Sequence, residues 1–175
     1  MKTLLLLLAL AVPAFAQVTP AATGKPKPLS AGDKKFVRDA LDGMYFEMEL
    51  AGKTKTGAKL EGTKTVANTL KTDLDKVWAE VSAVAGVHDE KIPTDLTGGD
   101  KSKSEKLGKA GDKFDKEFLK LVSHEADKLA KTFEAAAKSS ASDPEIKKIA
   151  ETWLPTLKEH TSKIDIAEKE AAKTK

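Results

Sequence analysis

Four long segments of the chain repeat their apolar residues with the period of an α-helix, and this repeat limits the fold more than any other feature of the sequence. The segments span about 30–53, 63–85, 112–139 and 143–170. In each, apolar side chains form a stripe along one helical face and polar side chains occupy the rest. No segment alternates apolar and polar residues as a half-buried strand does. The pattern therefore predicts an all-α fold, a four-helix bundle.

The fourth segment has the clearest start. Asp143 is a good N-cap residue, and Pro144 suits the first helical position because its missing N–H would have no partner there. Pro155 lies nearly opposite the apolar face, and the pattern continues in phase beyond it, so we expect a bend rather than an end. The apolar face of this segment carries Ile146, Ile149, Ala150, Trp153, Leu157, His160 and Ile164.

The first segment places an acid among its apolar residues. Ser30 stands three residues before Asp33, a spacing typical of a helix start. Glu47 falls on the inner face, whereas Glu49 points away from it. A buried carboxyl group is costly without a partner, so Glu47 needs one. The other residues of this face are Phe36, Val37, Ala40, Leu41, Met44, Met48 and Ala51.

The middle segments supply the remaining two apolar faces. In the second, Trp78 lies on the flank and Leu74 near the centre of the face; in the third, His124 falls on the far side, where we expect it to be exposed. The second face comprises Val66, Leu70, Leu74, Val77, Val81 and Val84. The third comprises Phe114, Phe118, Val122, Glu125, Ala126, Leu129 and Phe133.

Two connections join the first three helical segments, one between the first and second and one between the second and third. Residues 53–62 are rich in lysine, threonine and glycine, and 86–113 are irregular apart from a possible short helix at 102–107. A connection as long as 86–113 allows a crossover along the bundle, as in ferritin-like topologies, but it also leaves an up-down-up-down order open.

The N-terminus has the features of a secretory signal peptide. Residues 1–16 combine Lys2, a short apolar run and the small-residue site before Gln17. We expect 17–29 to be a disordered leader, 30–170 a single domain and 171–175 a frayed tail. Cleavage of 16 residues from 175 leaves a mature chain of 159 residues. We expect the mature protein to be exported to the periplasm or outside the cell, with the surface of the outer membrane as an alternative location.

Composition narrows the possible partners. The chain has no cysteine, so no disulfide is available and stability must come from one hydrophobic core. Beyond the signal peptide no stretch is apolar enough to span a membrane. Without Lys2, 29 basic residues stand against 27 acidic ones, and Arg38 is the only arginine. Lysines interleaved with acids are typical of a solvated helical surface, and we expect no nucleic-acid face.

Several short runs of residues stand out as motifs. They are Asp33-Lys34-Lys35-Phe36-Val37, Glu47-Met48-Glu49-Leu50, Ile92-Pro93, Phe114-Asp115 with Phe118, Ser142-Asp143-Pro144-Glu145-Ile146 and Leu154-Pro155-Thr156-Leu157-Lys158-Glu159-His160. Together they resemble the motifs of a widespread bacterial family of secreted, ferritin-like four-helix proteins of unknown function, often labelled predicted outer membrane proteins. The resemblance covers 30–160; its last third matches best and its second helix least well.

The resemblance implies a pattern of buried histidines that this chain keeps only in part. The family usually has an Asp-His pair on the second helix, another on the third, and a histidine ending the last motif. Here His160 ends that motif, but the other two histidine positions hold Leu74 (or Lys71) and Ala126. The inward metal-ligand candidates reduce to Glu47, Glu125 and His160, without the Glu-x-x-His spacing of ferritin-like sites.

We therefore expect Glu47 and His160 to meet as a buried hydrogen-bonded pair, and we predict no cofactor. An enzyme is the less favoured interpretation, because cysteine is absent and Gly98-Gly99 lacks the lysine and strand of a phosphate-binding loop. The favoured function is an exported, non-enzymatic bundle that binds a partner, a small ligand or an envelope surface. The alternative is a ferritin-like metal-binding or stress-protective protein that uses Glu47 and His160.

Overall fold

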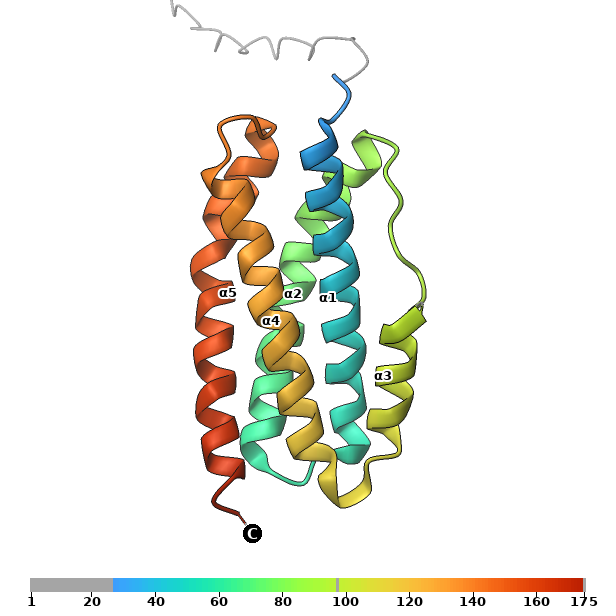
Figure 1. Ribbon diagram of the computed structural model, residues 1–175, viewed down its shortest axis with the longest axis vertical. Helices are drawn as coiled ribbons and strands as arrows, with labels where there is room; N and C mark the ends of the chain where they lie inside the picture. The colour runs from blue at the N-terminus through green and yellow to red at the C-terminus, as the bar shows by residue number, and fades with distance from the viewer. Residues whose placement is uncertain (1–26, 97, 175) are drawn as a thin grey trace, which may run out of the picture.

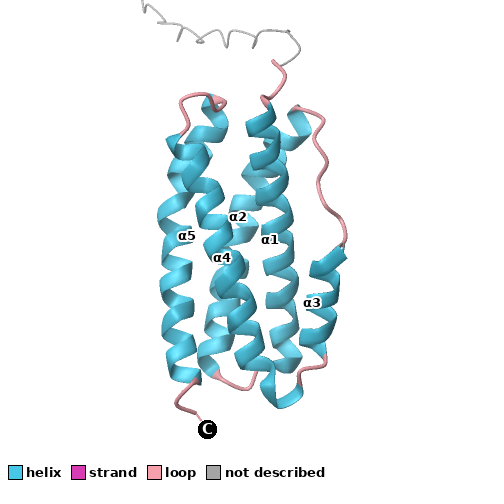
Figure 2. Cartoon of the chain, in the orientation of Figure 1, coloured by secondary structure: helices cyan, strands magenta, loops and turns pink. Residues whose placement is uncertain are grey.

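The structure is a computed structural model that describes residues 27–96 and 98–174 (Figure 1). Its elements are α1 (Ala31–Gly57), α2 (Glu61–Val87), α3 (Gly98–Gly108), a 3-10 turn η1 (Gly111–Lys113), α4 (Phe114–Lys138) and α5 (Pro144–Ala171). Within the described ranges all regular structure is helical (Figure 2). The predicted signal peptide, 1–16, and residues 17–26 of the predicted leader lie outside these ranges.

The four long helices pack side by side around one core. α1 packs against α2 and α4, and α5 packs against the same two helices, so α1 and α5 lie at opposite corners. The connection after α2 descends the length of the bundle, and α4 starts at the end where α2 also starts (Figure 1). α3 lies within this connection and packs on the outside of α1 and α4. The long connection is thus a crossover, one of the two orders that the sequence allowed.

Both predicted caps are present. The Ser30 hydroxyl accepts a hydrogen bond from the Asp33 backbone N–H at 3.1 Å, and the Asp143 carboxylate accepts one from the Glu145 N–H at 2.9 Å. The buried Asp33 carboxylate also accepts from the Asp143 backbone N–H at 3.3 Å. This contact ties the start of α1 to the start of α5, although the two residues are far apart in the sequence.

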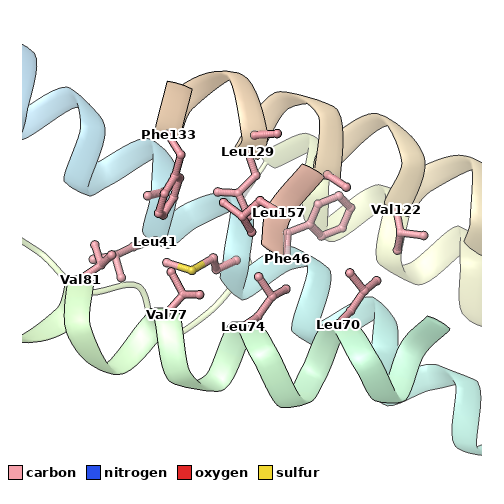
Figure 3. Close-up of a cluster of buried hydrophobic side chains, with 14 of the residues drawn as sticks. Leu41, Phe46, Leu70, Leu74, Val77, Val81, Val122, Leu129, Phe133 and Leu157 are labelled. Carbon is pink, nitrogen blue, oxygen red and sulfur yellow. The ribbon is translucent and has the colours of Figure 1, made fainter. Parts of the chain in front are cut away.

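The predicted apolar faces form the core. Trp78 and Trp153 lie at its edge, partly buried, as does Met48. Figure 3 shows how the central cluster draws on all four long helices, through Leu41, Phe46, Leu70, Leu74, Val77, Val81, Val122, Leu129, Phe133 and Leu157. Phe46, Leu50 and Leu119 are also buried, which the single-stripe pattern did not predict. Phe46 is buried beside α3, whose Lys103 ammonium stands near its ring.

The loop between α1 and α2 is shorter than the sequence suggested. The predicted connection 53–62 reduces to Ala58, Lys59 and Leu60. The Lys59 and Leu60 backbone N–H groups both donate to the buried carboxylate of Asp115, at 3.1 and 3.0 Å. A carboxylate from α4 thereby satisfies N–H groups at the start of α2 that no residue of their own helix can bind.

The ends of the other helices differ by a few residues from those predicted from the sequence. α3 runs from Gly98 to Gly108, longer than the predicted 102–107, and only its Ser104 and Leu107 are buried. Gly111 has φ +55°, a left-handed conformation that glycine adopts without steric cost, where the chain turns into α4. Pro155 lies inside an uninterrupted α5 and is exposed.

The close approach of α1 to α4 generates a stability prediction. A Cβ atom at Gly57 would lie 2.3 Å from the buried ring of Phe114, whereas one at Gly52 would meet nothing within 4 Å. We expect Gly57→Ala to destabilise the fold by about 1–3 kcal/mol through overpacking. Gly52→Ala should stabilise it by about 0.5–1 kcal/mol because alanine favours the helix. Denaturant unfolding of the two variants measures the difference; equal stabilities would contradict the close contact.

Candidate functional site

The most unusual group in the core is the carboxyl of Glu47, at the middle of α1. Its side chain is 0 % exposed, and neither carboxyl oxygen has a hydrogen-bond partner. Burial raises the pKa of Glu47 well above its ordinary value of 4.5, and the negative charge of nearby Glu125 raises it further. Glu47 therefore favours the protonated, uncharged form.

Glu125, on α4, is also buried, but it is paired. One carboxylate oxygen lies 3.4 Å from the Lys103 ammonium and the other 3.5 Å from the Lys128 ammonium. Lys103 comes from α3, donates to Asp100 at 2.9 Å and stands 5.3 Å from the centre of the Phe46 ring. The hydrogen bond to Asp100 and the charge of Glu125 raise the pKa of Lys103 despite partial burial. α3 thus places a cation beside the buried carboxylate of Glu125.

The predicted pair of Glu47 with His160 does not form, and this prediction is wrong. His160 is buried as expected, but its Nε2 lies 3.2 Å from a carboxylate oxygen of Asp73 on α2, while its Nδ1 has no partner. Because α1 and α5 occupy opposite corners of the bundle, a side chain on α5 reaches α2 or α4 more readily than α1.

Asp73 is the site residue that the sequence analysis missed. It is partly buried, and burial alone would raise its pKa; the hydrogen bonds from His160 and Lys76 outweigh this and lower it. Burial likewise lowers the pKa of His160, although Asp73 partly offsets the effect. A signal was available, since Asp73 directly precedes Leu74, one of the two positions where the resemblance would place the second-helix histidine.

The three metal-ligand candidates are not brought together. Glu47 and Glu125 lie near each other, and His160 lies with Asp73. Across 27–96 and 98–174, no group of three or more His, Cys, Asp or Glu side chains is arranged to hold one metal ion. His124 is exposed, as predicted, and His88 is half-buried at the end of α2. Glu125 faces two lysine ammonium groups in place of further ligands, and Glu47 has no partner.

A second candidate site is a groove of about 840 Å³ between the first turns of α1 and the second half of α4, which we call the α1–α4 groove. Phe36 and Ala136, both buried, form its floor. Its lining contains three lysines and three aspartates, of which Asp33 is buried and bonded to the Asp143 backbone N–H. The lining comprises Ser30, Gly32, Asp33, Lys35, Phe36, Asp39, His124, Asp127, Lys128, Lys131, Thr132, Ala135, Ala136, Ser139, Ala141 and Ser142.

The titration of Glu47 generates a prediction about stability and pH. Its pKa is 4.5 when exposed and higher when folded, so its contribution to stability is complete below pH 4.5 and is lost as the pH rises toward the folded value. Glu47→Gln cannot ionise, so its stability relative to the parent should rise with pH, by up to about 1.4 kcal/mol per unit.

Urea unfolding between pH 4 and 9 measures this difference, with the exposed Glu49→Gln on the same helix as the control. We expect the Glu49 variant to follow the parent at every pH. Parallel pH profiles for the parent and Glu47→Gln would show that Glu47 is solvated and charged.

Comparison with known proteins supports the fold and places the chain in a family. A search of curated proteins finds no match. The crystal structure of a DUF305 fragment from Deinococcus radiodurans superposes with a TM-score of 0.71 at 11 % identity, over 82 % of this chain and 99 % of that one. At this identity the likeness concerns the fold alone. The family model for a domain of unknown function, DUF4142, matches residues 18–165, and the chain therefore belongs to the DUF4142 family.

Proposed function

We propose that the protein is an exported, non-enzymatic binding module whose ligand occupies the α1–α4 groove. The observation that carries this proposal is the groove itself. Its volume of about 840 Å³ falls within the range of about 300–1,000 Å³ that is usual for ligand sites. An apolar floor beneath a charged rim supplies both the buried area and the orienting groups that such a site needs.

A polypeptide segment fits the groove best. Residues 124–139 of its α4 wall extend over about 22 Å at 1.5 Å per residue, long enough for several turns of a bound helix or an extended peptide. Grooves between helices commonly bind amphipathic segments through an apolar face. The groove presents both lysines and aspartates, which suits a ligand that carries both charges.

Two features support export. The features of a signal peptide occupy 1–16, and the family match begins at residue 18, directly after the predicted cleavage site. Among the helices of the described ranges, none is both long and apolar enough to cross a membrane. We propose the periplasm or the cell exterior as the compartment, with contact to the envelope rather than insertion into it.

Two observations favour binding over catalysis. The sequence has no cysteine nucleophile. The buried acid–base groups, Glu47 and His160, lie in separate parts of the core and are 0 % and 2 % exposed, so neither can transfer a proton to a molecule in the groove.

The groove can be tested by filling it. Ala135 is exposed on the α4 wall, and Ala135→Trp would occupy the groove without disturbing the core; Ala79→Trp on the exposed face of α2 is the matched control. Peptides selected from a random library on the mature protein should bind Ala135→Trp at least tenfold more weakly than the parent, and the Ala79 variant normally. If selected peptides bind both variants equally, the ligand does not occupy the groove.

Metal binding is the second candidate function, and Glu47 is the observation that favours it. A buried carboxyl with two unpartnered oxygens, beside a second carboxyl, resembles part of a metal site. The crossover between the two helical hairpins also supports this candidate, because one long crossover connection is a feature of ferritin-like bundles. Against it, Lys103 and Lys128 approach Glu125, and His160 lies elsewhere.

Elemental analysis of mature protein purified without chelator tests the metal-binding alternative. Near-stoichiometric metal that disappears in Glu47→Gln would establish it. Metal-free, folded parent protein would exclude a resident metal and leave the groove as the candidate site.

A further inference from the structure

Lysines gather at the end of the bundle where α1 and α3 finish. We call this surface the basic end and define it by Lys53, Lys55, Lys59, Lys106, Lys109 and Lys113. Two sequence-distant segments form it, and they are adjacent in space. A Cβ at Gly108 would lie 3.9 Å from the Lys53 Nζ atom, and the Lys59 ammonium forms an ion pair with Asp112.

The basic end differs in charge from the rest of the molecule. Lys2, Lys25 and Lys175 lie outside the described ranges, so the 30 basic residues become 27, equal to the 27 acidic ones. By contrast, residues 53–60 contain no acid, and 106–113 contain only Asp112, which Lys59 neutralises. Glu105 and Glu117 border the surface without interrupting it.

The lysines of this surface are also unusually free. On the long helices, lysines commonly pair with acids, as Lys34 does with Glu90 and Lys71 with Asp75. Within the described residues, the basic end has five lysines that make no such pair: Lys53, Lys55, Lys106, Lys109 and Lys113. Interaction with the helix dipoles explains the positions of Lys55 and Lys106, which lie in the last turns of α1 and α3. It does not account for Lys109 and Lys113, which lie at the turn between helices.

A small cavity opens beside these amines. It has a volume of about 300 Å³ and is lined by Lys103, Lys106, Leu107, Ala110, Lys113, Glu117 and Leu121. Leu107 is buried and the amines of Lys106 and Lys113 are exposed, so an apolar wall lies next to a positively charged mouth. With three lysines against the one carboxylate of Glu117, the cavity has an excess of positive charge and suits a phosphate group that carries a short apolar extension.

We propose that the basic end docks on an anionic lipid bilayer surface. Lysine clusters attract anionic headgroups at about 1 kcal/mol per residue near the surface, without the bidentate geometry that arginine provides. The cavity receives part of one headgroup and its glycerol. This site is independent of the α1–α4 groove, which lies at the other end of α1 (Figure 1).

Sedimentation with vesicles tests the proposal. Mature protein at low salt should bind vesicles of equal parts phosphatidylglycerol and phosphatidylcholine, but not pure phosphatidylcholine. Raised salt should weaken the binding, because screening acts strongly on exposed charges. Inorganic phosphate at matched ionic strength should not compete more than chloride does, since the bilayer and not the free anion is the ligand.

A matched pair of charge reversals locates the surface. The triple variant Lys55→Glu, Lys109→Glu and Lys113→Glu should lose about a hundredfold or more in vesicle affinity. The control Lys91→Glu, Lys138→Glu and Lys148→Glu makes the same change in net charge at the other end, through residues that are also exposed, and should retain binding within a fewfold.

Helical circular dichroism and thermal melting establish that both triple variants fold. The proposal is overturned if the parent protein does not bind anionic vesicles. It is also overturned if the two folded triple variants lose affinity equally. Selective competition by inorganic phosphate would also overturn it, because a free anion would then be the ligand.

Discussion

The burial of Glu47 is the constraint on which the rest of the core depends. Its carboxyl can remain inside the bundle only while it is uncharged, because no hydrogen bond compensates its desolvation. Glu125, its neighbour, is buried as a paired acid, with lysine ammonium groups at both oxygens. α3 contributes one of those ammonium groups, so the short helix in the crossover completes the charge balance of the core.

The sequence predicted the helices well because each long helix buries mainly one face, and a single stripe of apolar residues records that burial. It predicted less well where a second element covers the helix. Phe46 is buried beside α3, which has few apolar residues of its own. The short loop after Gly57 was missed because its stability comes from Asp115, a residue more than fifty positions away.

The candidate sites, like the fold, could be predicted only in part from the sequence. The burial of Glu47, Glu125 and His160 could be predicted from helical phase. Phase does not show which helices are neighbours, so it predicted neither the approach of Lys103 to Glu125 nor the absence of a partner for Glu47. His160 meets Asp73 because α5 adjoins α2. The groove depends on how two helices diverge at one end, which no local pattern encodes. It lies away from the basic end, so a molecule bound to a bilayer through those lysines would present the groove to the surrounding solution.

The most direct test of this account is the titration of Glu47 itself, followed by the carboxyl carbon resonance in protein with ¹³C-labelled glutamate and assigned with Glu47→Gln. The account predicts one glutamate whose pKa lies well above the ordinary value of 4.5 and whose resonance is missing from the variant. If every glutamate resonance titrates near 4.5, the core contains a solvated or paired carboxylate, and the account of its packing is wrong.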